Sequence, residues 1–403
     1  MNDKLRDANS LKKQLLQFPE PEVDAQRNSL ALVALICEEI AQAGGKIPFE
    51  RFMSLALTAP GLGYYSAGNQ KLGQHGDFVT APEISPLFSR CIAHQCDQVL
   101  TRLHQDGAAS ILEFGAGSGI MAAEILQELE RLQCLPEHYY ILEVSAELQQ
   151  RQRETIQRHV PHLDGRVTWL QALPQPPFRG IVLANEVLDA LPVHRFYKTP
   201  QGVGEYYVAW NGERFVWELG DMSRDLLTDF VSSLANDLPN NYQSEVNLSA
   251  AAWVGSVAEF MGEGVVLIVD YGFPRHEYYH AQRTQGTLMC HYRHRAHDDP
   301  FVYPGLQDIT AHVDFTAVAE AACDAGLDVA GYNSQGFFLM ANGLEKFVAS
   351  ADINNPEYVR TVQQIKTLTM PHEMGELFKV MALSKAYDGA LQGFQFQDLR
   401  DKL

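Results

Sequence analysis

The central part of the chain alternates between short apolar runs and stretches with helical spacing. The apolar runs have the length of strands, and the first two are followed by helical patterns at 121–133 and 146–159. This alternation is typical of a mainly parallel sheet with helices on both faces, whose ligands bind at the carboxyl ends of the strands. We therefore predict an α/β, doubly wound, Rossmann-like fold with strands at 111–114, 140–144, 167–170, 180–185 and 264–270.

Other patterns lie before, within and after this alternation. Residues 1–105 predict a helical N-terminal region, which contains a long loop rich in glycine and aromatic residues. Residues 346–403 predict a helical C-terminal segment. Between them, the core at 106–345 is interrupted by an insertion at 198–262.

The insertion combines a hairpin with helices. Alternating apolar positions at 205–219 predict the hairpin, and Asn211-Gly212 fits a two-residue turn between its strands. Helical patterns are expected over 222–262. Further along the chain, we expect a pair of strands at 327–332 and 336–340.

Composition narrows the possible partners and locations. With 31 Lys and Arg against 50 Asp and Glu, the formal net charge is −19. This charge argues against nucleic acid as a binding partner and favours a cationic substrate. No apolar run is long enough for a membrane span, and the first residues match neither a secretory signal nor a mitochondrial presequence, so we predict a cytoplasmic protein. His291, His294 and His297 lie in a loop without Cys partners, and we predict no metal site.

The first strand of the core ends in a glycine-rich turn. Gly115, Gly117 and Gly119 follow the apolar run, and helix-favouring residues come next. Such a strand, turn and helix let the backbone approach a nucleotide-like ligand closely. Glu143 ends the next strand, where its carboxylate could accept hydrogen bonds from two ribose hydroxyls. The pattern predicts a nucleoside site.

Two ligand classes fit such a site. Dinucleotide sites prefer G-x-G-x-x-G, whereas here the third glycine comes one residue early. Glu113, just before the turn, would repel a pyrophosphate but suits the ammonium and sulfonium groups of S-adenosylmethionine. The turn therefore favours S-adenosylmethionine, with a turn that binds nothing as the alternative.

Acidic residues follow the fourth strand. Glu186 and Asp189 are three positions apart, so one helical turn would place both carboxylates on the same side. Two carboxylates suit a guanidinium, because its planar fork pairs with carboxylate oxygens. Alternatively, Asp189 caps a helix or pairs with Arg195.

Four motifs, in this order, resemble the MidA family of S-adenosylmethionine-dependent methyltransferases. They are G-L-G-Y-Y…G-Q-H-G-D-F-V-T-A-P-E-I-S, L-E-F-G-A-G-S-G, N-E-V-L-D-A-L-P and G-T-L-M-C-H-Y…D-F, and they cover roughly residues 45–340. Mitochondrial members of this family methylate an arginine of a respiratory complex I subunit and act in its assembly. The resemblance implies a methyltransferase sheet and S-adenosylmethionine as the cofactor.

The resemblance also implies roles for individual residues. On the substrate side it implies Glu186 and Asp189, with His312 as a further candidate. The loop with Asp77, Phe78 and Thr80 would close over the cofactor. The cofactor-binding set expected in full is Glu113, Gly115, Ala116, Gly117, Glu143, Asp77, Phe78, Thr80 and Asn185.

These observations predict a methyltransferase acting on an arginine of a protein substrate. One alternative is a methyltransferase for small-molecule hydroxyls or amines, with His312 as a general base. Another is an assembly factor that binds the cofactor with little turnover. The insertion and its aromatic hairpin offer contact surface for a homodimer.

Overall fold

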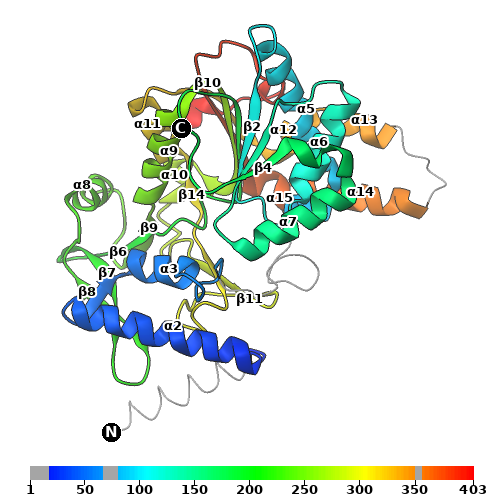
Figure 1. Cartoon of the computed structure of the whole chain (residues 1–403). Helices are drawn as coiled ribbons and strands as arrows, with labels where there is room; N and C mark the ends of the chain where they lie inside the picture. The colour runs from blue at the N-terminus through cyan, green and yellow to red at the C-terminus, as the bar shows by residue number, and fades with distance from the viewer. Residues whose placement is uncertain (1–17, 67–79, 350–355) are drawn as a thin grey trace. The chain divides into compact units, whose positions relative to one another are not determined.

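The computed structural model of the chain describes residues 18–66, 80–349 and 356–403 (Figure 1). The chain divides into two units, each built from three stretches of sequence. The first unit comprises residues 1–78, 192–246 and 284–311, and the second comprises 79–191, 247–283 and 312–403. The stretch 192–246 overlaps the insertion that we expected at 198–262.

A mainly parallel sheet forms the centre of the second unit. Its strand order is β15-β16-β10-β5-β2-β3-β4, and a short strand, β14, pairs in parallel with the end of β10. The pairs from β10 through β5, β2 and β3 to β4 are parallel, while β16 runs antiparallel to both of its neighbours. The predicted doubly wound fold is therefore confirmed. The strands are β2 Ser110–Phe114, β3 Tyr139–Leu142, β4 Val167–Leu170, β5 Phe178–Asn185, β10 Met261–Phe273, β14 Val313–Asp314, β15 Asp328–Ser334 and β16 Phe378–Lys385.

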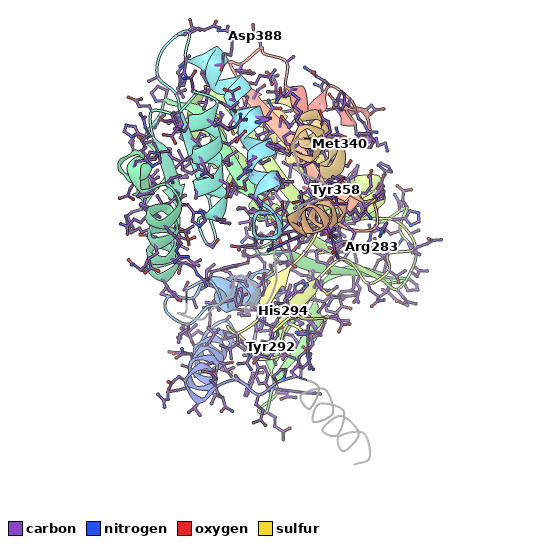
Figure 2. All side chains as sticks on the ribbon, turned by 90° about the vertical axis from the view of Figure 1, so that its right-hand side faces the viewer. Arg283, Tyr292, His294, Met340, Tyr358 and Asp388 are labelled. Carbon is purple, nitrogen blue, oxygen red and sulfur yellow. The ribbon has the colours of Figure 1, made fainter. Side chains whose placement is uncertain are left out.

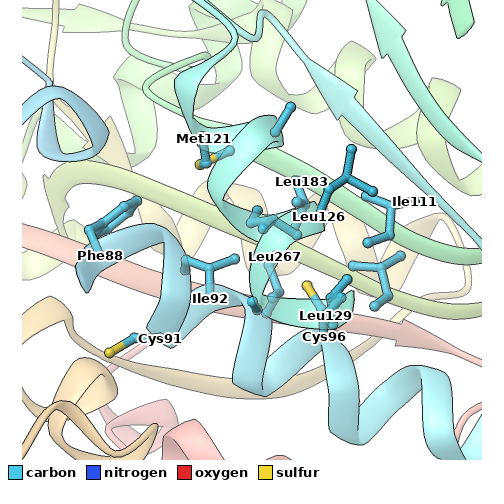
Figure 3. Packing of buried hydrophobic residues seen from close by; sticks show 14 of the residues in the cluster. Phe88, Cys91, Ile92, Cys96, Ile111, Met121, Leu126, Leu129, Leu183 and Leu267 are labelled. Carbon is cyan, nitrogen blue, oxygen red and sulfur yellow. The ribbon is translucent and has the colours of Figure 1, made fainter. Parts of the chain in front are cut away.

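Successive residues of each strand point to opposite faces of this sheet. Both faces are apolar, and helices of the second unit cover each of them. Ile111 and Leu183 pack with Phe88, Ile92 and Met121 on one face (Figure 3). Alternate strand residues pack on the other face with α9 and α11. The helices are α4 Ala81–Ile84, α5 Pro86–Leu103, α6 Ile120–Arg131, α7 Ala146–His159, α9 Leu248–Phe260, α10 Arg275–Tyr278, α11 Phe315–Asp324, α12 Gln335–Ala341, α13 Leu344–Ala349, α14 Pro356–Thr369 and α15 Met374–Leu377, with short 3-10 turns at Pro161–Arg166, Gln392–Phe394 and Arg400–Lys402.

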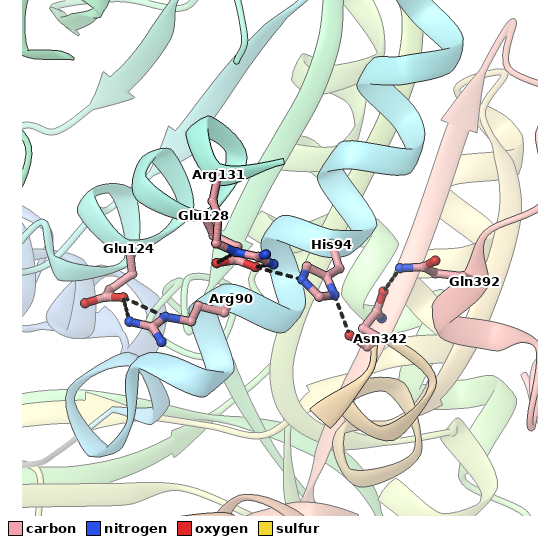
Figure 4. A network of polar contacts seen from close by, with 7 residues as sticks. All are labelled: Arg90, His94, Glu124, Glu128, Arg131, Asn342 and Gln392. Atoms are coloured by element: carbon pink, nitrogen blue, oxygen red, sulfur yellow. Dashed lines mark hydrogen bonds and ion pairs between the residues drawn. The ribbon is translucent and has the colours of Figure 1, made fainter. Parts of the chain in front are cut away.

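A polar network joins α5 and α6 to the last part of the chain. The ring of His94 contacts the Glu128 carboxylate through Nε2 and the carbonyl oxygen of Asn342 through Nδ1, both at 2.9 Å (Figure 4). Gln392 donates to the side chain of Asn342 at 2.7 Å. Because these groups are largely buried, their mutual hydrogen bonds remove the penalty of desolvating them.

The first unit carries a five-stranded and a three-stranded sheet, with orders β1-β7-β6-β9 (β8 pairs with β7) and β12-β11-β13. Phe49, Phe52 and Phe215 lie at its apolar centre. Tyr292 and His294 lie at the β11–β12 turn (Figure 2). The elements are α2 Val23–Gln42, α3 Phe49–Thr58, α8 Asp225–Leu234, β1 Lys46–Pro48, β6 His194–Thr199, β7 Gly202–Trp210, β8 Phe215–Gly220, β9 Tyr242–Val246, β11 Met289–Tyr292, β12 Arg295–His297 and β13 Asp308–Thr310.

Two details of the insertion differ from the prediction. The hairpin is present as β7 and β8, but Trp210 pairs with Phe215, so the loop spans four residues and not two. The Asn211 side chain accepts hydrogen bonds from the amides of Glu213 and Arg214 and stabilises this longer loop. Within the stretch predicted to be helical, β9 forms a strand that pairs with β6, and its polar residues Ser244 and Glu245 are buried.

The C-terminal third also differs from the prediction. Residues 336–340, expected as a strand, belong to helix α12. The predicted helical segment at 346–403 contains β16, which lies inside the sheet between β10 and β15. A short apolar run suits a helix and a buried strand equally, and its pairing with distant β10 decides the outcome.

Candidate functional site

The glycine-rich turn between β2 and α6 requires its glycines. Gly115, Gly117 and Gly119 have φ angles of 59°, 54° and 82°, a region that residues with a side chain rarely adopt. A Cβ on Gly119 would also lie 2.9 Å from the Cα of Gln152 on α7. Helix α7 therefore packs directly against the turn.

Glu143 lies at the carboxyl end of β3, beside this turn. Its side chain is buried and accepts hydrogen bonds from the amide of Ser145 at 2.9 Å and from Nε2 of Gln152 at 3.1 Å. The same Nε2 donates to the carbonyl oxygen of Gly117 at 3.1 Å. The glycine turn and the acid expected to bind ribose thus share one hydrogen-bond donor.

Gln152 was not singled out by the sequence analysis, although a signal was present. Leu148, Gln152 and Ile156 recur every four residues and form the buried face of α7. A glutamine on an otherwise apolar stripe must find buried partners. In the structure, these partners belong to the candidate site.

Glu113 lies on β2, one residue before its end, and is only 1% exposed. The hydroxyl of Tyr139 donates to its carboxylate at 2.7 Å. Burial raises the pKa of Glu113 to about 7, because desolvation outweighs this hydrogen bond. The carboxylate is therefore only partly ionised at neutral pH, and its expected attraction for a sulfonium is reduced accordingly.

The segment before α4 carries three of the expected cofactor contacts. Asp77 and Phe78 lie outside the described residues. Thr80 directly precedes α4, and its carbonyl oxygen accepts from the amide of Glu83 at 3.0 Å. The Glu83 side chain accepts a hydrogen bond from the hydroxyl of Ser118 in the glycine turn. Helix α4 therefore lies against the turn.

The end of β5 has an unusual backbone. Glu186 has a φ angle of +53°, and its amide donates to the carbonyl oxygen of Val269 on β10 at 2.8 Å. The side chain of Asn185 donates to the Glu186 carboxylate at 3.2 Å. A glutamate in the left-handed region is strained, and such strain gathers at functional sites.

Three more residues surround this end of β5. Asp189 is 4% exposed and accepts a hydrogen bond from the hydroxyl of Tyr271. Asp270, fully buried three residues before the end of β10, accepts from the amides of Leu188 and Asp189 at 2.9 and 3.2 Å. Burial raises the pKa of Asp189 to about 6 and that of Asp270 well above its usual range, the latter also through its acidic neighbours.

His312 approaches the same cluster through Tyr271. Its ring centroid is 5.2 Å from that of Tyr271 and 5.3 Å from that of Phe273. Burial lowers the pKa of His312 to about 4, with the charges of Arg283 and Lys379 acting in the same direction. The imidazole is therefore neutral at pH 7.

The structure thus brings the expected residues into two groups. Gly115, Ala116, Gly117 and Glu143 gather at the ends of β2 and β3, whereas Glu186, Asp189 and His312 gather at the ends of β5 and β10. Asp270 and Tyr271 belong to the second group and received no role from the sequence. Arg195, the alternative partner considered for Asp189, instead faces Glu245 at 3.5 Å.

Comparison with known proteins supplies the family. A model of S-adenosyl-L-methionine-dependent methyltransferases matches residues 91–333. The chain belongs to this family. The methyltransferase is also similar to a Burkholderia thailandensis protein whose crystal structure contains S-adenosyl-homocysteine, with a TM-score of 0.91 and 44% identity over 96% of this chain and 100% of that one. These findings confirm the predicted resemblance, the activity class and S-adenosylmethionine as the cofactor.

Two curated relatives carry a more specific name. The mitochondrial protein arginine methyltransferase NDUFAF7 of Danio rerio is 30% identical to the methyltransferase over 85% of this chain and 84% of its own. The Drosophila melanogaster homolog is 30% identical over 84% and 82%. Both are mitochondrial by name, which overturns our prediction of a cytoplasmic protein; the early polar residues were too indirect a basis for it. Among the residues described, the helices are all too short or too polar to cross a membrane.

The residues at the first group fit S-adenosylmethionine. The three glycines, all with positive φ angles, leave parts of the turn backbone uncovered by side chains, and the buried carboxylate of Glu143 supplies hydrogen-bond acceptors beside it. A carboxylate acceptor beside a glycine-rich turn is suited to a nucleoside with a free ribose.

Proposed function

We propose that the methyltransferase transfers a methyl group to an arginine side chain of a protein substrate. The cluster of Glu186, Asp189 and Asp270 supports this proposal most strongly, because a guanidinium is the natural partner of carboxylates held side by side. The names of the two relatives support the same substrate class. A net charge of −19 also favours a basic segment over an acidic one.

When bound, S-adenosylmethionine supplies a methyl group on a sulfonium centre. We assign its ribose to Glu143 and its methionine portion to the glycine turn, with Asn185 nearby at the end of β5. Asp77, Phe78 and Thr80 stay predicted cofactor contacts. Because the transfer is a displacement at carbon, most of the catalysis is expected to come from positioning.

On the acceptor side, Glu186 and Asp189 would bind the guanidinium. Asp189 has one carboxylate oxygen, Oδ1, that is buried without a hydrogen-bond partner among the described residues, and it could accept from the substrate. The two carboxylates would hold the positive charge on the guanidinium nitrogens that they contact and leave one guanidinium nitrogen directed at the methyl group. Asp189, with its pKa near 6, or the neutral His312 would take the proton that is released.

Isotope-labelled cofactor tests this proposal. The purified protein is incubated with labelled S-adenosylmethionine and a set of arginine-containing polypeptides, and the label is located by mass spectrometry. Label on arginine is the expected result. Label on a hydroxyl or amine of a small molecule would indicate the other enzyme class, and tight binding of S-adenosyl-homocysteine without transfer would favour an assembly factor.

A matched pair of variants tests the role of the acids. Glu186→Gln is expected to lower kcat/KM by about 10- to 100-fold, the loss of one hydrogen bond to a charged group, with unchanged affinity for S-adenosyl-homocysteine. Glu259→Gln, an exposed position on α9, is the control. Full activity in Glu186→Gln would contradict the assignment. The predicted homodimer stays a prediction, to be measured by sedimentation.

A further inference from the structure

Gln152 links two groups of the cofactor site to the indole of Trp169 through one side chain. It is fully buried on α7, and its Nε2 lies 3.1 Å from both the Glu143 carboxylate and the carbonyl oxygen of Gly117. Its Oε1 accepts a hydrogen bond at 2.9 Å from the indole Nε1 of Trp169, near the end of β4. Both the nitrogen and the oxygen of the carboxamide are thus hydrogen-bonded.

The arrangement fixes the orientation of the carboxamide. Trp169 Nε1 can only donate, so it selects the oxygen of Gln152 and turns the NH2 group toward Glu143 and Gly117. The absence of a side chain at Gly119 lets α7 approach the turn, because a Cβ there would lie 2.9 Å from the Cα of Gln152. Arg153, whose guanidinium lies 3.9 Å from the Trp169 ring centroid, supports the indole from the next position on α7.

We infer that Gln152 is a positioning residue of the cofactor site, which holds the Glu143 carboxylate and the glycine turn in the geometry needed for the nucleoside. This inference rests on the proposed assignment of Glu143 to the ribose. The carboxylate has two oxygens, and Ser145 and Gln152 each donate to a different one. Without Gln152, the oxygen that faces α7 would lose this donor, and the orientation of the carboxylate toward the ribose would be less well defined.

The expected consequence is a defect in cofactor binding with little effect on the chemical step. Gln152→Met keeps the volume and removes all three hydrogen bonds. It is expected to weaken S-adenosyl-homocysteine binding by about 10-fold. KM for S-adenosylmethionine should rise similarly while kcat changes by less than about 2-fold, because the ribose is remote from the transferred methyl.

A double-mutant cycle with Glu143→Gln distinguishes this role from a general structural one. If Gln152 acts through Glu143, Gln152→Met should weaken binding by about 10-fold in the wild-type background and by about 2-fold in the Glu143→Gln background. Gln150→Met, an exposed position on the same helix, is the control. Calorimetric titration with S-adenosyl-homocysteine gives the four dissociation constants.

A failure of the Gln152 inference can be told apart from a failure of the ribose assignment of Glu143. Equal losses in the two backgrounds, or a fall in kcat with unchanged KM, would overturn the inference about Gln152 alone. Normal binding by Glu143→Gln would overturn the ribose assignment and the inference with it. Should Gln152→Met not fold, Trp169→Phe removes the bond that orients the carboxamide and keeps an aromatic ring beside Arg153; a loss of about 3-fold confined to the wild-type background is then expected, and no loss would overturn the inference.

Discussion

The buried carboxylate of Asp189 is expected to lower the stability of the folded protein at neutral pH. Its carboxyl group is 4% exposed, and burial raises its pKa from 3.8 to about 6. A raised pKa means that the folded state binds the proton more tightly than the unfolded state. Ionisation of Asp189 therefore lowers the free energy of unfolding, and this loss is complete above pH 6 and disappears as the pH falls below 4. At pH 7 this loss corresponds to roughly 3 kcal/mol, since a tenfold change in acidity is about 1.4 kcal/mol.

The substitution Asp189→Asn removes the ionisable group and keeps an oxygen for the Tyr271 hydroxyl. It should raise the free energy of unfolding by up to about 3 kcal/mol at pH 7 and by about half of that at pH 5, where the wild-type carboxyl is mostly protonated. Methyl transfer should fall by about 10- to 100-fold, because a neutral amide binds a guanidinium more weakly than a carboxylate does.

Urea denaturation at several pH values measures the stability difference. Asp388→Asn serves as the control, because that side chain is 92% exposed (Figure 2), and it should change stability by less than about 0.5 kcal/mol. If Asp189→Asn is no more stable than the wild type at pH 7, or if the difference does not shrink toward pH 5, the argument from burial is wrong.

Three further substitutions test neighbouring features. Glu186→Gly should relieve the strained left-handed backbone and raise the free energy of unfolding by about 1 kcal/mol, while methyl transfer is lost; a less stable variant would show that the strain is compensated. Gly119→Ala should lower the free energy of unfolding by about 1–3 kcal/mol, because its Cβ would meet Gln152 and its φ is positive; thermal melting measures this loss. Tyr139→Phe should lower the free energy of unfolding by about 1–3 kcal/mol at pH 8 and by less at pH 6, where Glu113 is mostly protonated; a loss of stability that does not change with pH would contradict this reasoning.

The sequence predicts the parts of the fold that local patterns decide. Short apolar runs locate the parallel strands, and the spacing of Gly115, Gly117 and Gly119 locates the turn whose φ angles require glycine. Strands β9 and β16 were missed because their pairing partners are distant in the chain. A short stretch of sequence around β9 or β16 does not include β6 or β10, the strands with which they pair.

The same limit applies to the site. Glu143, Glu186 and Asp189 follow strands, so the fold class alone places them at the carboxyl edge of the sheet. Tyr271 is 82 positions from Asp189, whose carboxylate it contacts. No spacing along the chain indicates that contact, and only the adjacency of β5 and β10 creates it.

The position of β16 has a consequence for how the protein is made. Strand β10 leaves the ribosome roughly 100 residues before β16, an interval of about 5–20 seconds at ordinary rates of translation. During this time one edge of β10, rich in valine and isoleucine, has no strand to pair with. An unpaired apolar edge recruits other chains. Successful expression should therefore depend on chaperones that act on the growing chain, and slower translation after residue 273 should increase aggregation.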